Sequence, residues 1–350
     1  MWLRGRRHGV HNGRVQQRLT RVATADGARI AVGTSGAGAP LLYVSGWLSH
    51  LDEGRRLREE RMFLDTLAAG RTLVRYDRAG CGMSGPASGP PTLASELAQL
   101  DAVTAQLRQP LDVVAASLGA PVAAAWVAAD PGRVRRLVLY GGWAHGAELA
   151  ETDVRAHVLG MIDAHWGLGS DVLTDIFAPD AGPGLRARVA EYQRASSDAA
   201  TARALLELGY GLDIRELLPR VSAPTLIVQR TGDRAVPVAQ SQALASGIPG
   251  AELALLPGRS HLPYVGEVAE LVAVIRRFLG LPASRRGTDG LTPRQREVAA
   301  LIGEGRSNRE IAERLGIELR SAEGHVERIL ERLGARSRTE IAGWWARQVG

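Results

Sequence analysis

Three residues of this chain have side chains suited to nucleophilic chemistry, and each follows a short apolar run: Ser117, Asp233 and His261. A serine hydroxyl is a weak nucleophile until a histidine accepts its proton, and a carboxylate beside the imidazole stabilises the resulting cation. Taken singly, Asp233 is equally well explained as a turn residue and His261 as a loop histidine. Taken together, the three predict attack on an acyl group by Ser117, with His261 as the base and Asp233 as its partner.

The elements that must position these residues alternate between apolar runs and helical patterns. Strands are predicted at residues 40–44, 72–76, 111–115, 137–140, 225–229 and 252–256, and helices include residues 92–107, 120–129 and 266–279. Because the strands are almost continuously apolar and alternate with helices, they predict a parallel α/β sheet. Residues 18–34 predict a hairpin that turns at Asp26 and Gly27.

Residues 142–218 interrupt this alternation with a mostly helical segment that is rich in alanine and leucine. Inserted over the carboxyl edge of the sheet, such a segment would act as a lid, or cap. Its aromatic side chains are expected to form the core of the cap, with at least one of them lining a pocket: Trp143, Trp166, Phe177 and Tyr192.

The residues around Ser117 have the pattern of a nucleophile elbow, a sharp turn between a strand and a helix. The strained turn requires small neighbours, and the stretch 115–119 (AASLG) supplies them. Ala115 stands where the pattern usually has glycine, and alanine is the mildest replacement. A Ser-x-Gly turn is often structural, so the later aspartate and histidine are what favour a catalytic role.

Residues 17–281 resemble the α/β-hydrolase superfamily, whose serine, acid and histidine occur in this chain order. Two further loops carry the resemblance, residues 45–51 (SGWLSHL) and residues 76–85 (YDRAGCGMSG). The resemblance implies an α/β-hydrolase fold with a mostly parallel sheet, a helical cap and a Ser-His-Asp triad. It also implies that the amides of Trp47 and Leu118 form an oxyanion hole.

The first of these loops departs from the superfamily, because Ser45 stands where histidine is usual. The form of the loop is similar to a narrower group in which the hydrolase-like domain is joined to regulatory or signalling output domains. His50 is expected to be a structural hydrogen-bonding residue, and Trp47 either packs beneath the cap or borders the site. No substrate is named by the sequence, and a partly apolar pocket with Ser117 at its floor is expected.

Residues 291–338 contain three helical periods separated by short breaks that carry glycine. Apolar residues recur every three or four positions within residues 292–304, 308–315 and 319–333, which is the helical signal. Glycine next to the end of each period is a normal helix stop. The short break between the second and third periods allows the steep crossing of a helix-turn-helix.

This stretch resembles the C-terminal DNA-binding domain of LuxR-type regulators. The match is long and ungapped, and it is carried by Leu291, Thr292, Pro293, Arg294, Glu297, Val298, Gly305, Ser307, Asn308, Glu310, Ile311, Ala312, Leu315, Gly316, Ile317, His325, Val326, Ile329, Leu333, Gly334, Arg336, Ser337 and Arg338. In that family the third helix enters the major groove of double-stranded DNA, and a fourth helix, here residues 339–348, helps two copies pair. A homodimer on a two-fold site is therefore expected.

The candidate DNA contacts lie on the second and third helices and just after them. They are Asn308, Arg309, Arg320, Ser321, Glu323, Arg328, Arg336 and Arg338. For each arginine taken singly, a solvated helix face is an equal alternative. Glu323 and Gly324 depart from the family, which commonly has a basic and a helix-compatible residue there. For Ile341, Trp344 and Trp345 in the fourth helix, packing onto the protein's own helices is the equal alternative to pairing.

The whole chain of 350 residues, 45% of them hydrophobic, fits two domains. We expect a mobile basic N-terminus at residues 1–16, a hydrolase-like domain at 17–281, a linker at 282–290 and a helix-turn-helix domain at 291–350. No apolar run reaches about 18 residues and no secretory signal is evident, so a cytoplasmic protein without a membrane span is expected. With Cys81 as its single cysteine the chain forms no internal disulfide, and we expect no metal site and no cofactor.

The two domains together predict a DNA-binding transcriptional regulator whose hydrolase-like domain senses a small molecule. The alternative is a serine esterase or related hydrolase whose helical tail only localises or dimerises it. The small-molecule ligand or ester substrate is unknown in both interpretations, and whether the triad turns over stays open.

Overall fold

The described part of the chain falls into two compact units that divide between Leu281 and Pro282. The computed structural model describes residues 17–107, 110–282, 291–333, 335 and 337–349. The predicted mobile segment 1–16 lies outside the described residues, as do residues 283–290 of the predicted linker. Within the described ranges, no helix combines the length and the apolar character needed to cross a membrane.

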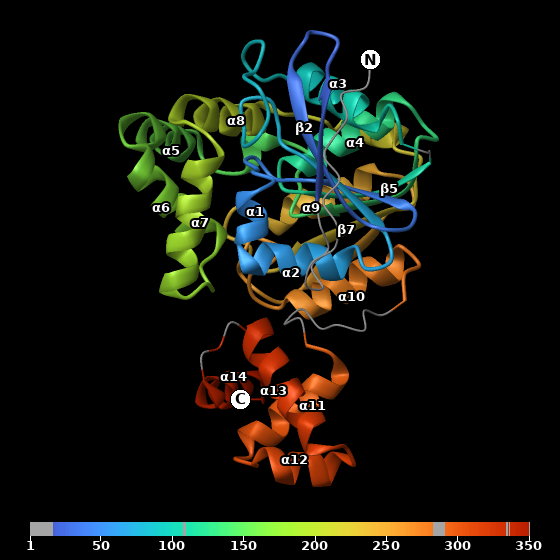
Figure 1. Cartoon of the computed structure of the whole chain (residues 1–350). Coiled ribbons are helices and arrows are strands. Elements are labelled where there is room, and N and C mark those ends of the chain that lie inside the picture. Colours follow the sequence, from blue (N-terminus) through green and yellow to red (C-terminus); the bar gives the residue numbers. More distant parts are fainter. Residues whose placement is uncertain (1–16, 108–109, 283–290, 334, 336, 350) are drawn as a thin grey trace. The chain divides into compact units, whose positions relative to one another are not determined.

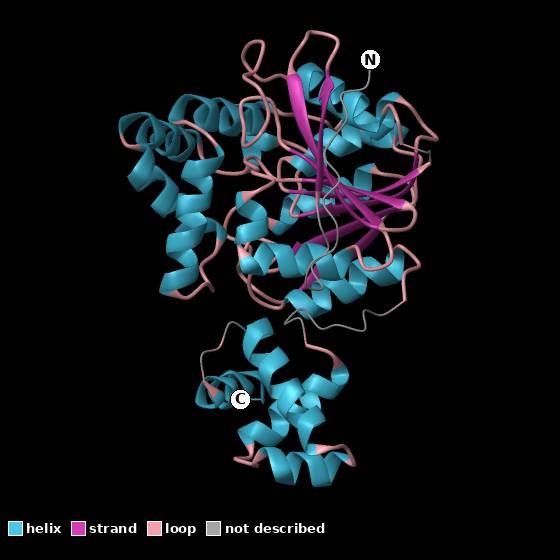
Figure 2. Ribbon diagram, viewed as in Figure 1, coloured by secondary structure: helices cyan, strands magenta, loops and turns pink. Residues whose placement is uncertain are grey.

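The first unit is built on an eight-stranded twisted sheet, drawn in magenta in Figure 2. Its strands are β1 (Arg18–Ala23), β2 (Arg29–Gly36), β3 (Pro40–Val44), β4 (Thr72–Tyr76), β5 (Leu111–Ala116), β6 (Val134–Tyr140), β7 (Thr225–Arg230) and β8 (Glu252–Leu256). They lie in the order β1-β2-β4-β3-β5-β6-β7-β8. Strands β3 to β8 run parallel, whereas β2 runs antiparallel to β1 and β4. This topology confirms the predicted fold class and hairpin, and it brings the carboxyl ends of β5, β7 and β8 to one edge.

Helices cover both faces of the sheet (Figure 1). One face carries α3 (Leu93–Thr104), α4 (Gly119–Ala129) and α9 (Val238–Gly247), and the other carries α2 (Arg58–Leu67) and α10 (Val268–Phe278). Successive residues of β3 alternate between the two cores, with Leu42 and Val44 in the first and Leu41 and Tyr43 in the second. Because both faces are buried, the parallel strands are almost continuously apolar.

Some elements of this unit have weak sequence patterns. The sequence pattern does not predict the helices α1 (Glu53–Arg56), α2 and α9. It also predicts that β6 begins at residue 137. The strand begins at Val134, where Arg135 and Arg136 interrupt the apolar run. Its pairing with β5 shifts register there, from Leu111 opposite Val134 to Asp112 opposite Arg136. Arg136 donates to the carbonyl of Leu279 at 2.7 Å. Helix α9 buries polar Gln240 and Ser241 beside Leu244, so it lacks an apolar stripe.

The cap consists of four helices between β6 and β7, drawn in green to yellow in Figure 1. They are α5 (Thr152–Ala164), α6 (Trp166–Phe177), α7 (Pro183–Ser196) and α8 (Ala199–Gly211). All four fall within the segment 142–218 that was expected to be mostly helical. Two indoles belong to its framework, because Trp166 Nε1 donates to the carbonyl of Ser197 at 3.0 Å and Trp143 Nε1 donates to that of Gly209 at 3.1 Å.

The second unit is a bundle of four helices around one small core. The helices are α11 (Pro293–Gly303), α12 (Asn308–Leu315), α13 (Leu319–Leu333) and α14 (Arg338–Val349). Capping boxes begin α11, where Thr292 pairs with Gln295, and α12, where Ser307 pairs with Glu310. These boxes satisfy amides that the first helical turn leaves unpaired. The three predicted helical periods and the fourth helix are therefore confirmed.

The apolar face of α14 packs onto its own unit. Ile341 is fully buried in the bundle core, and Trp344 and Trp345 pack against it while half-buried. A side chain at Gly303 would come within 2.5 Å of the Trp345 ring, so the indole lies directly on α11. These three residues thus form intramolecular contacts, which is the alternative to pairing that the sequence leaves open.

Candidate active site and DNA-binding surface

Ser117 lies at the sharp turn between β5 and α4. Its φ of 54° makes it the one non-glycine residue with positive φ among the described residues, a conformation that stores backbone strain. Its amide donates to the carbonyl of Tyr140 at 2.9 Å, which ties the turn to β6. A side chain at Gly119 would lie 2.5 Å from the carbonyl oxygen of Ser45 and 2.6 Å from that of Val44. The turn can therefore approach β3 only with glycine at residue 119.

Gly119→Ala should push the elbow away from β3. We expect it to lower the free energy of unfolding by about 1–3 kcal/mol or more, because close-packed backbone cannot absorb the added methyl group. Gly160→Ala is the matched control, since no atom lies within 4 Å of the new side chain in the exposed middle of α5. That variant should gain up to about 1 kcal/mol from helix propensity. Urea unfolding measures both, and equal stabilities would contradict the assigned clash.

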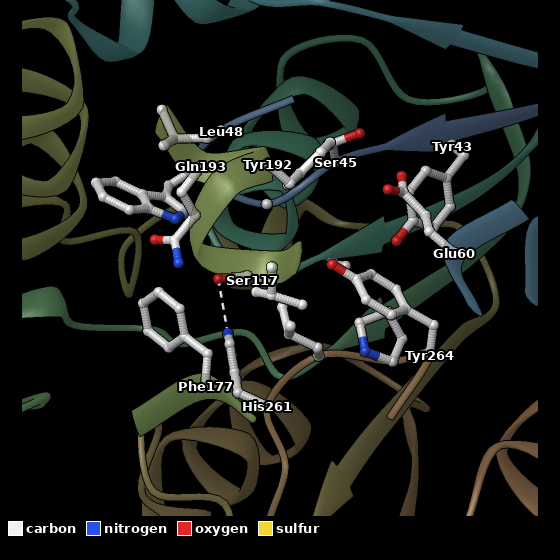
Figure 3. Close-up of a pocket in the computed structure, with 16 residues that line it drawn as sticks. Tyr43, Ser45, Leu48, Glu60, Ser117, Phe177, Tyr192, Gln193, His261 and Tyr264 are labelled. Atoms are coloured by element: carbon white, nitrogen blue, oxygen red, sulfur yellow. Dashed lines mark hydrogen bonds between the residues drawn. The ribbon is translucent and has the colours of Figure 1, made fainter. Parts of the chain in front are cut away.

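His261 connects Ser117 to Asp233, as the sequence predicts. The imidazole Nε2 lies 2.8 Å from Ser117 Oγ, and Nδ1 lies 2.8 Å from Asp233 Oδ2; Figure 3 draws the first of these contacts. All three residues follow carboxyl ends of parallel strands, β5, β7 and β8. Because Asp233 accepts at Nδ1, the proton of the neutral ring sits there and Nε2 is free to accept the serine proton.

The carboxylate of Asp233 is held by several donors. Its Oδ1 accepts from the amides of Ala235 at 2.8 Å and Val236 at 3.2 Å, and its Oδ2 also accepts from Gln229 Nε2 at 3.1 Å. Burial raises the pKa of Asp233, but the charge and hydrogen bond of His261, together with the two amides, outweigh burial and hold the pKa below its usual value. Asp233 is therefore a carboxylate at neutral pH, as stabilisation of an imidazolium requires. Gln229 is a supporting residue that the sequence pattern does not identify.

The loop that carries His261 is attached to the cap. The amides of His261 and Leu262 both donate to the carbonyl of Phe177, at 2.7 Å and 3.1 Å. The Phe177 and His261 rings lie 5.6 Å apart. Asp180, which follows α6, pairs with Arg259 at 2.6 Å. The end of α6 therefore fixes both the backbone and the ring of the histidine.

The predicted oxyanion-hole amides belong to Trp47, which follows Gly46, and to Leu118, which follows Ser117. In the part of the chain that the structure describes, the N–H groups of Trp47 and Leu118 donate to no protein acceptor. Gly46 brings the first of these loops against the nucleophile, because a side chain at residue 46 would lie 3.3 Å from Ser117 Cβ. Two free backbone donors beside a serine hydroxyl are what stabilisation of an oxyanion needs.

Arg78 holds the loop that carries Trp47. Its guanidinium donates to the carbonyl of Gly46 and, at 3.1 Å, to that of Ser45, and it pairs with Glu96 at 2.7 Å. Both charged side chains are only 1% exposed. Because a trans peptide points its carbonyl and its N–H in opposite directions, fixing the Gly46 carbonyl also fixes the direction of the next N–H. The sequence does not identify this role, and its one signal is the loop 76–85.

His50 and Cys81 have structural surroundings. The Nδ1 of His50 accepts from the amides of Asp52 and Glu53, both at 3.3 Å, at the start of α1, and the amide of His50 donates to the Tyr192 hydroxyl at 3.2 Å. These contacts agree with the expected structural role. Burial raises the pKa of the Cys81 thiol to about 12. That thiol therefore stays protonated and unreactive at neutral pH.

Two cavities open onto Ser117 and His261, and Trp47 and Phe177 line both of them. The larger has a volume of about 180 Å³, and its lining includes Trp143, Leu149, Val158, Leu173, Ile176 and Leu205. The smaller has a volume of about 70 Å³, and its lining, shown in Figure 3, includes Tyr43, Ser45, Glu60, Tyr192, Gln193 and Tyr264. Of the four aromatic cap residues, Trp143, Phe177 and Tyr192 thus line a cavity. Trp166 instead packs edge-on against Trp47, with ring centres 6.1 Å apart.

Glu60 of α2 is a buried acid at the smaller cavity. Burial raises the pKa of Glu60 from the ordinary 4.5 to about 7, with Arg75 opposing the rise and Asp77 reinforcing it. Between these two values the folded protein keeps a proton that the unfolded chain has released. The contribution of Glu60 to the free energy of unfolding should therefore be largest below pH 4.5. It should decrease by at most roughly 3 kcal/mol as the pH rises through 7.

Glu60→Gln should flatten this pH dependence, because glutamine does not titrate. Urea unfolding midpoints at about pH 5 and about pH 8 provide the measurement. Glu59→Gln is the matched control, since the neighbouring carboxylate is 25% exposed and pairs with Arg188 at 3.0 Å. An identical pH dependence in the unmodified protein and in Glu60→Gln would refute the assignment.

The second unit carries the candidate DNA contacts on α12 and α13. Exposed side chains are found at Arg309, Arg320, Ser321, Glu323 and Arg328. Arg338 donates to Asn308 Oδ1 at 2.8 Å and also to the carbonyl of Arg306, so it fastens the start of α14 to the start of α12. Arg336 lies outside the described residues. On α13, a side chain at Gly324 would lie 3.3 Å from the Arg328 guanidinium, which folds over the glycine.

Comparison with known proteins assigns both units. A family model described as the alpha/beta hydrolase family matches residues 20–274, and one described as bacterial regulatory proteins, luxR family, matches residues 289–345. The transcriptional regulatory protein MctR of Rhizobium johnstonii is 52% identical over 48 residues, which cover 14% of this chain and 22% of that regulator. The chain thus spans only about a fifth of MctR. Pyrrolizixenacetamide deacetylase of Xenorhabdus hominickii is 26% identical over 215 residues, covering 59% of this chain and 80% of that protein.

Solved structures share the fold of the first unit. An esterase from Exiguobacterium antarcticum superposes with a TM-score of 0.66 at 18% identity, covering 75% of this chain and 99% of its own. A bromoperoxidase from Bacillus anthracis gives a TM-score of 0.66 at 20% identity, covering 75% of this chain and all of its own. At such identities the likeness shows the fold alone. Together with the family match over residues 20–274, it shows that the chain belongs to the alpha/beta hydrolase family, with a LuxR-type DNA-binding domain as its second unit.

Proposed function

We propose that this protein is a transcriptional regulator that binds double-stranded DNA through its LuxR-type unit and senses a small molecule through its hydrolase-fold unit. One observation carries the proposal: the same chain combines a LuxR-type domain with an assembled Ser117–His261–Asp233 site. In that site Ser117 Oγ lies 2.8 Å from His261 Nε2, and Asp233 accepts from the other ring nitrogen. The similarity to MctR, a transcriptional regulatory protein by name, supports the DNA-binding half. Such a regulator would act in the cytoplasm as a homodimer on a two-fold site.

The chemistry expected on the ligand follows from the groups around Ser117, which are the imidazole, the carboxylate behind it and the two backbone amides. The serine oxygen attacks the acyl carbon of the ligand while His261 Nε2 takes the hydroxyl proton, and Asp233 stabilises the imidazolium. The amides of Trp47 and Leu118 stabilise the negative oxygen of the tetrahedral intermediate. His261 then gives its proton to the leaving alcohol as the carbon–oxygen bond breaks. Water deprotonated by His261 releases the acyl group from Ser117 as a carboxylic acid.

Regulation requires that the ligand, free or attached to Ser117, favours one arrangement of the two units over another. A mobility shift of the full-length protein on its own promoter region tests the proposal, and we expect a specific, salt-sensitive complex. Arg320→Glu should weaken that complex about tenfold or more, because the exposed arginine lies on α13. The matched control, Arg220→Glu, makes the same charge change on the hydrolase-fold unit, and this variant should bind DNA as tightly as the unmodified protein. No specific complex at any salt concentration, with or without ligand, would overturn the proposal.

The alternative is a serine esterase whose helical unit only localises or dimerises it. The assembled Ser117–His261–Asp233 contacts favour it, as does the name of one similar protein, a deacetylase. Turnover of short-chain aryl esters without any specific DNA complex would support this alternative. A serine that does not react with a fluorophosphonate would count against it.

A further inference from the structure

Two residues that line the smaller cavity, Glu60 and Gln193, each carry a buried oxygen without a protein partner among the described residues. Within the described residues, Oε2 of Glu60 and Oε1 of Gln193 have no hydrogen-bond partner, and the two residues are 6% and 3% exposed. Native structures rarely leave buried polar atoms unpaired, because the desolvated group then loses its bonds to water. Both atoms are oxygens, and above pH 7, where Glu60 is ionised, both accept hydrogen bonds. The group that then complements this cavity is a hydrogen-bond donor.

The surroundings of Glu60 define that donor further. Arg75, itself 5% exposed, donates to the other carboxylate oxygen, Oε1, at 3.2 Å. Because Arg75 already neutralises the carboxylate, the partner at Oε2 need not carry a positive charge. Tyr43 and Tyr264 line the same end of the cavity, and Figure 3 shows them grouped with Glu60 to the right of the Ser117–His261 pair. A neutral hydroxyl or amide N–H fits this end best.

The orientation of Gln193 is fixed by its contacts. Its Nε2 donates to the carbonyl of Ser170 at 3.1 Å and to Thr174 Oγ1 at 2.7 Å. A carbonyl can only accept, so the nitrogen must face Ser170 and the oxygen must be the free atom. Two of the lining residues therefore each have an oxygen that lacks a donor.

The larger cavity favours an apolar group rather than a hydrogen-bond donor. Its walls are mostly aliphatic and aromatic side chains from α5, α6 and α8 of the cap, among them Val158, Leu173 and Leu205. Its volume is about 180 Å³. An apolar cavity of about 150 Å³ holds a benzene ring in another protein, so this space suits a compact apolar group.

We infer that the ligand is an acyl compound with two unlike arms, one compact and apolar in the larger cavity and one bearing a neutral hydroxyl or amide N–H that donates to Glu60. Ser117 and His261, which border both cavities, lie where the arms meet. The inference rests on the proposed function in placing the acyl carbon at Ser117. The assignment of Glu60 as the acceptor rests on the cavity itself.

Two esters that differ by one hydroxyl test the assignment, propyl butanoate and 3-hydroxypropyl butanoate. Calorimetry at about pH 8, where Glu60 is ionised, measures their binding to the full-length Ser117→Ala protein, which retains both cavities and cannot hydrolyse them. The result therefore depends on neither turnover nor DNA binding. We expect the hydroxyl-bearing ester to bind about ten- to a hundredfold more tightly, the range for a hydrogen bond to a charged group.

Two further variants in the Ser117→Ala background locate the effect. Glu60→Gln should reduce the preference to a few-fold at most, because Arg75 retains the amide oxygen and the NH₂ group then makes only a neutral hydrogen bond to the hydroxyl. Glu59→Gln should keep the preference, since Glu59 pairs with Arg188 and is not part of the cavity lining. Equal affinity for the two esters, binding of neither, or an unchanged preference in Glu60→Gln would overturn the inference. A failure of the proposed function can be told apart from a failure of this inference. In that case Ser117 of the unmodified protein would not react with a fluorophosphonate, while the preference for the hydroxyl-bearing ester would persist.

Discussion

Ser117→Ala is expected to abolish labelling of the protein by a fluorophosphonate and to lower kcat for p-nitrophenyl butanoate by a factor on the order of 10⁶. The loss is large because the serine, the histidine and the aspartate act as a unit, so the base has nothing to activate once the hydroxyl is gone. The variant should remain folded, since alanine removes one oxygen and leaves the contacts of the Ser117 amide and carbonyl with Tyr140 and Ala120 in place. Steady-state kinetics and circular dichroism provide the measurements.

Two comparisons make the result for Ser117 specific. Ser88→Ala removes an exposed serine hydroxyl that donates to the carbonyl of Asp26. This variant should react with the fluorophosphonate and hydrolyse the ester as the unmodified protein does. Asp233→Asn should retain the fold but lose about 10⁴-fold in kcat, because the amide favours the wrong imidazole tautomer. Undiminished labelling of Ser117→Ala would place the reactive residue elsewhere and remove the basis of the mechanism.

Arg78→Met should impair both stability and catalysis. It leaves Glu96 as a buried charge without its partner at 2.7 Å, which should lower the free energy of unfolding by about 3–5 kcal/mol. It also removes the donors to the carbonyls of Ser45 and Gly46, so the N–H of Trp47 is no longer held in a fixed direction for the oxyanion. Loss of one oxyanion-hole donor should reduce kcat by about 10²–10³-fold. Urea unfolding and ester hydrolysis measure the two effects separately.

A second variant separates these two effects. In Arg78→Met/Glu96→Leu the unpaired charge is gone, and an apolar pair of similar size should restore most of the lost stability. The double variant still lacks the donors to the loop 45–47, so kcat should stay low. Recovery of full activity along with stability would mean that Arg78 acts only through folding and does not position the amide.

Much of this fold can be predicted because its signals are local. Continuous apolar runs arise where a strand is buried on both faces, and they locate β3, β4, β5, β7 and β8 within a residue or two. The same holds for α11 to α14, whose apolar stripes, capping residues and glycine stops lie within a few positions of one another. The serine, aspartate and histidine are found because each stands just beyond such a run.

The remaining features depend on partners that lie far apart in the sequence. Arg78 meets Glu96 and the carbonyl of Ser45 only after the sheet has formed, and the loop 76–85 that marks it in the sequence does not reveal these partners. Glu60 belongs to a helix that the pattern does not name, and its unpaired oxygen is visible only once the cavity is built. The contact of Arg338, a candidate DNA-binding residue, with Asn308 is likewise visible only in the folded bundle.

The attachment of the cap to the histidine loop couples the position of the end of α6 to that of the imidazole. Moving the end of α6 away would withdraw the Phe177 carbonyl from the amides of His261 and Leu262 and leave the imidazole without its backbone anchor. A molecule with the end of α6 displaced could bind a ligand but would hold the imidazole too loosely for proton transfer. Hydrolysis would therefore require the cap to lie against the histidine loop.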